Sequence, residues 1–305
     1  MSAAVRHEPD AVPELFAAIE RDWRPGPVEN SEFVTAAPAK AFAGVLDQQA
    51  PSTGVGDALP PLWHWLYLLD RPAQSDLGED GHPRQGGLFL PPLPDRRRMF
   101  GGGRLEFRAP IRIGDLLTRR SEIADLRVRR GGSGWLLLVT VRHVYLVDGE
   151  VRTVEEQDLV YKQPDPAQAA ARIPDTAEPG PAASWSYVLR PDPTLLFRFS
   201  ALTYNAHRIH YDRDYATGVE GYPDLVVHGP LLALSLLELP RRFAPDRTVA
   251  SFAFRSRAPL FAPEEIVVSG FPEDDRAVLT AGRPGAAPGI TATVTLNRTS
   301  KEVPR

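Results

Sequence analysis

The sequence has no cysteine, only two methionines and only three lysines. Without cysteine the chain can form no disulfide framework, no thiolate metal site and no cysteine nucleophile, and a cytoplasmic location becomes the default. No apolar run approaches the roughly 20 residues that a membrane helix requires. The opening residues also lack the basic start and apolar stretch of a secretion signal. We therefore expect a cytoplasmic protein that is neither secreted nor built into a membrane.

An excess of positive charge is also absent. The chain of 305 residues carries 35 basic and 39 acidic residues, a net charge of −4, which argues against a broad nucleic-acid-binding surface. Nearly all the basic residues are arginine, which reflects either a compositional bias or a supply of bidentate phosphate donors. With 31 prolines and 24 glycines, helices should be few and short, and strands and turns should dominate.

An internal repeat organises the chain. A Phe-Arg…Ala-Pro string begins at Phe107 and again at Phe254, and the two Ala-Pro pairs are 149 residues apart. Each string follows an apolar helix candidate and precedes strand-like segments rich in Val, Ile, Leu and Thr. This order predicts a duplicated unit, a buried helix against an antiparallel sheet. The helix candidates are residues 62–69 and 231–239, and the strand candidates are 116–128, 135–147 and 151–161, then 266–271, 277–280 and 290–296.

Composition also suggests where each unit begins and ends. We expect an N-terminal extension over residues 1–30, a first half over 31–163 and a second half over 185–305. Residues 164–184 between them are rich in Pro and Ala, as in a semi-extended linker. A second irregular stretch, residues 71–94, interrupts the first half, and loops of such length in compact domains are usually functional or mobile.

The densest polar cluster lies in residues 199–216. It places Asn205, His207 and His210 within six positions, and imidazole groups exchange protons near neutral pH. Asp212 follows two positions later, where it is suited to cap a short helix. The cluster is the best candidate for acid–base chemistry in the sequence.

The second helix candidate begins just after this cluster, at the string Val-Val-His-Gly-Pro. Pro230 suits the first turn of a helix, and Gly229 lets another group approach the backbone closely. The N–H groups at a helix N-terminus are unpaired and carry partial positive charge. They can therefore stabilise a developing oxyanion.

Two strings of the second half resemble a known family. They are Leu-Thr-Tyr-Asn-Ala-His-Arg-Ile-His-Tyr-Asp at 202–212 and Gly-Tyr-Pro-Asp-Leu-Val-Val-His-Gly-Pro at 221–230. Together they resemble the signature of MaoC-like (R)-specific enoyl-CoA hydratases. Within that family they are most similar to the branch that contains mitochondrial-type 3-hydroxyacyl-thioester dehydratases and mesaconyl-C4-CoA or itaconyl-CoA hydratases. The resemblance implies an α+β double hot-dog fold, each half a helix wrapped by an antiparallel sheet.

The resemblance also implies three catalytic groups. His210 takes the place of the family's catalytic His, and the backbone N–H of Gly229 that of the oxyanion donor. Asn205 stands where the wider family has an Asp. Because an amide cannot accept a proton near neutral pH, we assign the acid–base work to His210 and the orientation of water to Asn205. The implied reaction is reversible hydration of a short-chain enoyl-CoA, mesaconyl-C4-CoA-like or itaconyl-CoA-like. It requires no metal or redox cofactor, and coenzyme A enters as part of the substrate.

Six further residues are candidates for substrate binding. Arg208 is placed to pair with a substrate carboxylate or, equally, with Asp212 or Asp214 nearby. Tyr204 is a candidate for the pocket lining, although buried aromatic rings often only pack. For these residues the sequence leaves both alternatives open.

The other candidates are two histidines and two arginines. His207 and His228 serve either the substrate or the structure around the site. Arg97 and Arg98 belong to the run Asp-Arg-Arg-Arg-Met-Phe-Gly-Gly-Gly, whose arginines suit the phosphates of coenzyme A and whose glycines permit close approach. A solvated run of charge is the alternative.

The first half resembles the second without its polar cluster. His64 occupies its helix start, but residues 33–42, the expected counterpart of the catalytic loop, contain neither Asn nor His. We therefore expect the first half to be catalytically empty, to complete the fold and to form one wall of the acyl tunnel.

Other functions remain open from the sequence. The same chemistry could dehydrate 3-hydroxyacyl chains on acyl carrier protein. A hot-dog thioesterase, or an acyl-thioester-binding protein without catalysis, are alternatives of other classes. The expected partner is an acyl-CoA or acyl carrier protein thioester, with no nucleic acid and no membrane. A homo-oligomer such as a dimer is open, since the duplication can already supply a pair of units in one chain.

Overall fold

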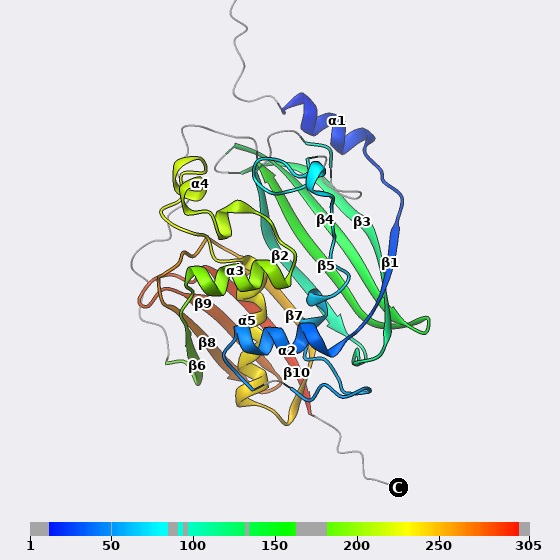
Figure 1. Ribbon diagram of the computed structural model, residues 1–305, viewed down its shortest axis with the longest axis vertical. Coiled ribbons are helices and arrows are strands. Elements are labelled where there is room, and N and C mark those ends of the chain that lie inside the picture. The colour runs from blue at the N-terminus through cyan, green and yellow to red at the C-terminus, as the bar shows by residue number, and fades with distance from the viewer. Residues whose placement is uncertain are drawn as a thin grey trace, which may run out of the picture.

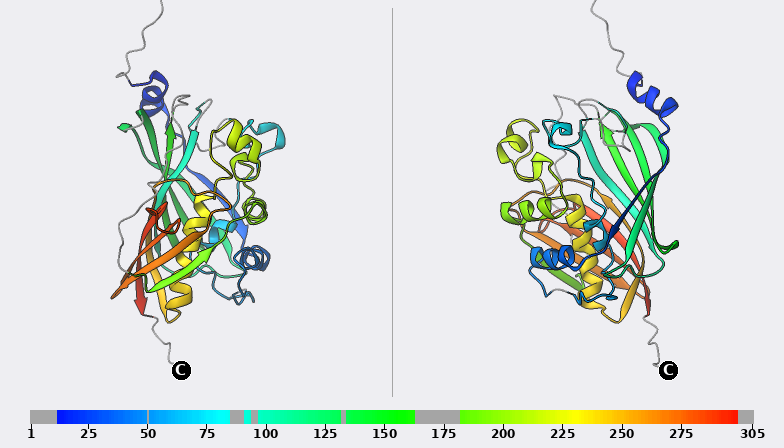
Figure 2. Two further views of the ribbon diagram at one scale, coloured as in Figure 1. Left: turned by 90° about the vertical axis from the view of Figure 1, so that its left-hand side faces the viewer. Right: turned by 45° about the vertical axis from the view of Figure 1, so that its right-hand side comes forward.

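The computed structural model describes residues 12–49, 51–84, 91–93, 97–131, 134–162 and 182–298. Ten antiparallel strands form one continuous sheet, and the long helices lie on one of its faces (Figures 1 and 2). The first half supplies β1 (Val28–Phe33), β2 (Arg97–Phe107), β3 (Leu116–Gly131), β4 (Gly134–Val147) and β5 (Glu150–Lys162). The second supplies β6 (Trp185–Leu189), β7 (Arg247–Ser256), β8 (Ile266–Glu273), β9 (Arg276–Gly282) and β10 (Ile290–Arg298).

The strand order records the duplication. It runs β1-β3-β4-β5-β2 through the first half and then β7-β10-β9-β8-β6 through the second, which is the same order reversed. The halves meet where β2 pairs with β7 in antiparallel register, from Gly102 opposite Arg255 to Glu106 opposite Ser251. The prediction of a duplicated antiparallel sheet unit is confirmed, and so is the α+β double hot-dog fold.

The helix of the second half is α5 (Gly229–Phe243), as predicted from its apolar run. Ten consecutive residues, 231–240, are buried, because the sheet lies on one side of α5 and two helices lie on the other. These are α2 (Ala36–Val45) and α3 (Pro193–Leu202), which cover α5 in Figures 1 and 2. No helix of the described ranges is long and apolar enough to cross a membrane.

The helix predicted at residues 62–69 of the first half is wrong. The structure has only one 3-10 turn there, η1 (Trp63–Leu66), and backbone of positive φ at Leu62 (68°) and Leu68 (54°) bounds it. Neighbouring side chains of the turn reach different partners: the Trp63 indole donates to Glu238 of α5, and the Trp65 indole to Glu155 of β5. These tertiary contacts override the apolar pattern.

Residues 33–42 also differ from the prediction. They end β1 and begin α2, and α2 has the place in the first half that α3 has in the second. Phe42 of α2 and Phe199 of α3 pack with ring centroids 6.0 Å apart. The segment is therefore the counterpart of α3, and the loop that corresponds to the catalytic loop follows α2.

The predicted boundary at residue 31 falls inside β1, which begins at Val28. The expected extension also holds α1 (Glu14–Asp22), whose Phe16 and Ile19 belong to one buried apolar cluster with Leu137 and Val139 of β4. Part of residues 1–30 thus belongs to the first half. Residues 163–181, nearly all of the expected linker, lie outside the described residues, and β6 begins at Trp185.

The glycines after Arg98 are required by close packing within the sheet. A Cβ at Gly102 would lie 2.5 Å from the carbonyl oxygen of Phe254 in β7, and one at Gly101 would lie 2.9 Å from Val160 in β5. Side chains here would push β2 out from between its two neighbours. The close approach that these glycines permit is that of the neighbouring strands, and a contact with the phosphates of coenzyme A stays a prediction.

Candidate active site

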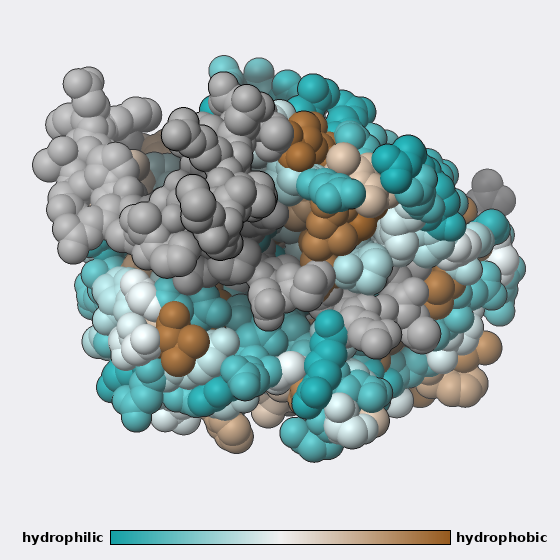
Figure 3. All heavy atoms as spheres, turned by 90° about the horizontal axis from the view of Figure 1, so that it is seen from above, coloured by the Kyte–Doolittle hydropathy of each residue, from teal (hydrophilic) through white to brown (hydrophobic). Residues whose placement is uncertain are grey.

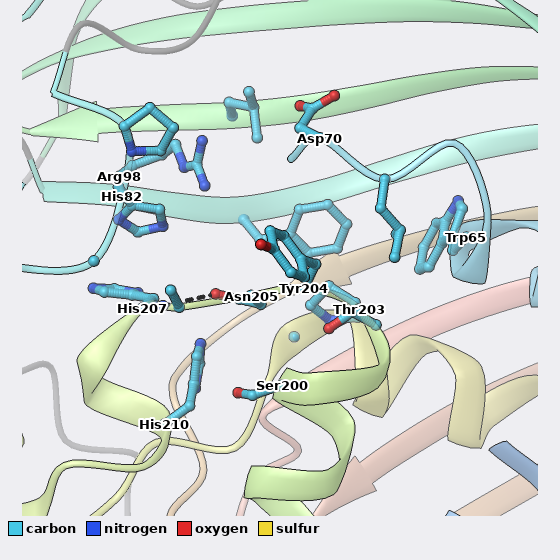
Figure 4. Close-up of a pocket in the computed structure, with 18 of the residues that line it drawn as sticks. Trp65, Asp70, His82, Arg98, Ser200, Thr203, Tyr204, Asn205, His207 and His210 are labelled. Carbon is cyan, nitrogen blue, oxygen red and sulfur yellow. Dashed lines mark hydrogen bonds between the residues drawn. The ribbon is translucent and has the colours of Figure 1, made fainter. Parts of the chain in front are cut away.

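A cavity of about 1940 Å³ is lined by residues of both halves. The second half contributes the end of α3, the loop after it and the start of α5, and the first half contributes strands and the extended residues after η1. Typical small-molecule pockets are roughly 300–1,000 Å³. The cavity therefore has room for a ligand as long as an acyl thioester with its carrier arm. Figure 4 shows the side chains around it.

His210 ends the 3-10 turn η3 (Arg208–His210) and lines this cavity. Its Nδ1 donates to the carbonyl oxygen of Val226 at 2.7 Å, which leaves Nε2 as a proton acceptor. Burial lowers the pKa of His210 to about 4, against the opposing effect of the Val226 hydrogen bond. The ring is therefore neutral near pH 7 and can act as a base. In Figure 4 it stands below Asn205 and His207.

Gly229 lines the same cavity at the N-terminus of α5. The first N–H groups of a helix have no partner within the helix, so its amide is available to a ligand. A Cβ at this position would lie 3.1 Å from Cδ1 of Phe100, because β2 of the first half packs directly against the helix start. The predicted base and the predicted oxyanion donor thus share one cavity.

Asn205 lies on the loop between α3 and η3 and also lines the cavity. Its backbone N–H donates to the carbonyl oxygen of Ser200 at 2.8 Å, and its Oδ1 accepts the backbone N–H of His207 at 2.9 Å. These bonds orient the side-chain amide and leave its nitrogen for another acceptor. The geometry is consistent with an amide that positions a water molecule or the substrate.

His228 is placed behind His210 and not in the cavity. Its side chain is fully buried, and its Nε2 lies 2.8 Å from the Ser200 hydroxyl. The ring stacks on that of His210, with centroids 3.7 Å apart and planes inclined by 19°. Burial lowers the pKa of His228 well below its usual value, and the charge of His210 adds to this. Of the two alternatives left open by the sequence, the structural one fits His228, whose ring supports that of His210.

Arg208 turns away from the cavity. Its Nε and Nη2 donate to Oδ2 of Asp212 at 2.9 and 2.7 Å, and its guanidinium lies 4.1 Å from the centre of the Tyr215 ring. Of the two alternatives left open by the sequence, the pair with Asp212 holds. Asp212 also accepts the backbone N–H of Tyr215 and so caps α4 (Arg213–Gly218), as predicted.

The remaining candidates divide between the cavity and the undescribed part of the chain. Tyr204, His207 and Arg98 line the cavity, and Tyr204 is 57% exposed at its rim. Arg98 reaches in from β2 and lies beside His82 in Figure 4. Arg97 belongs to β2, but its side chain lies outside the described residues.

Sequence reasoning missed two residues of the first half. Asp80 and His82 belong to the irregular stretch at residues 71–94, for which the sequence predicts function or mobility without indicating a particular residue. The ring of His82 lies against that of His207, with centroids 4.0 Å apart. An Asp-Gly-His string in a long loop was the available signal, but its neighbour is 125 residues further along the chain.

Asp80, His82 and His207 place one donor atom each within 4.8 Å of the others. Oδ2 of Asp80, however, already forms a 2.9 Å hydrogen bond with Nδ1 of His82. The group is arranged as a hydrogen-bonded cluster. That the reaction needs no metal or redox cofactor stays a prediction.

Comparisons with known proteins agree with this geometry. Residues 62–262 match the family of hydroxyacyl-thioester dehydratase type 2. The chain is 46% identical over 263 residues to mesaconyl-C(4)-CoA hydratase of Chloroflexus aurantiacus, covering 85% of this chain and 91% of that one. A MaoC-like dehydratase from Phytophthora capsici superposes with a TM-score of 0.65 at 13% identity, over 91% and 97% of the two chains. A double-hotdog protein of Mycobacterium tuberculosis superposes with a TM-score of 0.52 at 16% identity, over 90% and 96%. The two structures show the fold alone.

Proposed function

This chain belongs to the hydroxyacyl-thioester dehydratase type 2 family, and from that premise we propose that it is a hydro-lyase. It adds water reversibly to the C2=C3 bond of a short-chain enoyl-CoA. The supporting observation is that a neutral imidazole, His210, and a free helix-terminal amide, Gly229, line one cavity. The identity with mesaconyl-C(4)-CoA hydratase favours a substrate of that kind.

The chemistry follows from these two groups. As the water oxygen bonds to C3, Nε2 of His210 accepts the proton that the water loses. Electron density moves to the thioester oxygen, where the N–H of Gly229 stabilises the enolate; removal of one such donor elsewhere costs about 2.7–4 kcal/mol. A proton then joins C2. In dehydration the same steps run backwards.

Three neighbours hold the base in position. The Val226 carbonyl fixes the His210 tautomer, and the stacked His228 ring, itself bonded to Ser200, fixes the orientation of the ring. Asn205 supplies an amide that can hold the attacking water. Such positioning reduces the entropy lost in reaching the transition state.

An assay of the purified protein tests the proposal. Enoyl absorbance is followed with mesaconyl-C4-CoA and, in parallel, with crotonyl-CoA. Loss of absorbance without release of free thiol supports hydration, and preference for mesaconyl-C4-CoA supports the substrate class. Preference for the linear substrate contradicts the dicarboxylic assignment, and release of free thiol identifies a thioesterase instead.

A second candidate keeps the mechanism and changes the carrier. The family description, hydroxyacyl-thioester dehydratase, favours dehydration of a 3-hydroxyacyl group and does not specify the carrier. Assays with the same 3-hydroxyacyl group on coenzyme A and on acyl carrier protein separate the two candidate carriers. The physiological carrier should give the higher kcat/KM.

A further inference from the structure

The proposed reaction needs two proton-transfer groups, and the second half supplies one. A base accepts the proton of the attacking water, and an acid delivers a proton to C2. His210 serves as one, but the amide of Asn205 cannot exchange a proton. On the strength of the proposed function, we propose that His82 of the first half, held by Asp80, is the second acid–base group.

Asp80 and His82 form a rigid hydrogen-bonded pair. Oδ1 of Asp80 accepts the backbone N–H of His82 at 2.9 Å, and Oδ2 lies 2.9 Å from Nδ1 of the ring. Because Nδ1 donates to the carboxylate, we assign the proton transfer to Nε2, the other ring nitrogen. His82 lines the cavity with 14% of its side chain exposed. This is the arrangement in which a carboxylate orients an imidazole for proton transfer.

The loop that carries this pair is fitted onto the catalytic loop of the second half. Gly81 has φ +87°, and a Cβ there would lie 1.8 Å from the carbonyl oxygen of Ala206. The backbone N–H of Arg208 donates to the backbone carbonyl oxygen of Asp80 at 2.9 Å, and the Arg208 guanidinium donates to the Glu79 carbonyl at 3.1 Å. Two segments far apart in the sequence therefore meet backbone to backbone, beside the cavity.

The charged groups around His82 indicate which of the neighbouring histidines can serve as the acid and which as the base. Asp80, His207 and His210 interact with the charge of His82, and Arg98 acts on the neighbouring His207. Burial would raise the pKa of Asp80, but the hydrogen bond and charge of His82 hold it well below its usual value. Burial, helped by His82 and His210, lowers the pKa of His207. Of the three rings, His82 has the carboxylate partner that stabilises a protonated form.

The steps then balance. In hydration, the water O–C3 bond forms while Nε2 of His210 takes the water proton, and Nε2–H of His82 gives its proton to C2. His210 is then protonated and His82 is neutral. The proton returns from His210 to His82 across the ring of His207, whose centroid lies 5.5 Å from that of His210 and 4.0 Å from that of His82. The net change is one water added to the double bond.

Three substitutions in the full chain test the assignment. His82→Gln should lower kcat by about 10²-fold or more. Asp80→Asn retains an oxygen for the backbone of His82 but removes the charge, and should give a smaller loss. Glu79→Gln is the matched control: it removes one exposed negative charge from the same loop and should behave as the parent protein.

The pH dependence distinguishes an acid from a merely structural residue. For hydration the acid must carry its proton, so the rate falls as pH rises through its titration. Asp80→Asn should move this limb to lower pH, because the carboxylate no longer stabilises the protonated ring, and Glu79→Gln should leave the limb in place. Added imidazole should also restore part of the activity of His82→Ala.

Three results would overturn the inference. The first is a parent protein that hydrates its substrate while His82→Gln retains its rate and pH profile. The second is activity that EDTA removes, Zn²⁺ restores and His82→Gln cannot recover, since the cluster would then be a metal site. The third is a parent protein inactive on every enoyl thioester, which refutes the proposed function as well and is therefore distinguishable from the other two.

Discussion

The two halves share a strand order and differ in what lies over the sheet. The second half has α5, 15 residues long, and the first half has the four-residue turn η1. After η1, residues 67–71 run along the cavity and line it together with Trp65. A full helix in both halves would fill that space. Loss of the helix in one copy therefore makes room for the substrate that the other copy's helix stabilises.

A buried histidine of each half, His64 in η1 and His210 in η3, meets a different environment. His64 is 2% exposed and faces Glu155, a fully buried carboxylate that also accepts the Trp65 indole at 3.0 Å. Burial would raise the pKa of Glu155, but its partners, His64 first, lower it to about 2. His210 faces a carbonyl and keeps one nitrogen for the cavity. One imidazole is committed to an internal carboxylate and the other remains free to react.

We expect the largest effect from substitution of His210, the histidine that remains free to react. His210→Gln should lower kcat/KM for the enoyl-CoA by roughly 10²–10⁴-fold, because the base is lost. His64→Gln should leave kcat/KM within a few-fold of the parent, because His64 does not line the cavity. Hydration rates of both variants, with their melting temperatures, check this. Equal losses of rate would mean that the two histidines are not functionally distinct.

We expect Glu155 to contribute to the stability of the fold and not to catalysis. Glu155→Ala leaves the Trp65 indole and the Gln157 amide without their acceptor, and breaking a buried charged network costs about 3–5 kcal/mol. Urea unfolding measures the loss, and activity assayed at low temperature should persist in the folded fraction.

Glu150→Gln is the control for this substitution. Its ion pair with Arg152 is exposed at the glutamate, and exposed pairs contribute little to stability. A Glu155→Ala variant as stable as Glu150→Gln would contradict the role given to the buried carboxylate.

Acid should destabilise both halves together. Burial lowers the pKa of His143 in the first half and of His210 in the second to about 4, from the usual 6.5. The unfolded chain then binds protons that the folded chain does not, so stability falls as pH drops from about 6.5 toward 4. At pH 5 each histidine accounts for about 2 kcal/mol. The Glu155 contribution persists through this window, because its pKa of about 2 lies below it.

Urea unfolding at pH 7.5 and pH 5 measures this difference. His143→Gln should reduce the pH dependence by about one histidine's share and leave the remainder, because the His210 contribution is intact. A free energy of unfolding that does not change between the two pH values would contradict the buried, neutral state of these rings.

The sequence predicts elements whose signal is local. The apolar run of α5, the strands and the repeat of the Phe-Arg…Ala-Pro string are all readable along the chain, as is the capping of α4 by Asp212. The turn η1 is not, because Trp63 and Trp65 follow partners on α5 and β5. The ring contact between His82 and His207 joins segments that are distant in the sequence, and no local pattern predicts it.

The smallest expected effect concerns substrate binding by two arginines, one from each half. Arg98 of the first half lines the cavity, and no carboxylate of the described residues pairs with it. Arg208 of the second half is held by Asp212 outside the cavity. Arg98→Gln should therefore raise KM about tenfold, the loss of about 1.4 kcal/mol expected of one charged hydrogen bond to an anionic substrate group. Arg208→Gln should leave KM unchanged, although its Asp212 pair and its bond to the Glu79 carbonyl are lost. Steady-state kinetics with mesaconyl-C4-CoA decide between them: a raised KM in Arg208→Gln alone would assign anion binding to the second half.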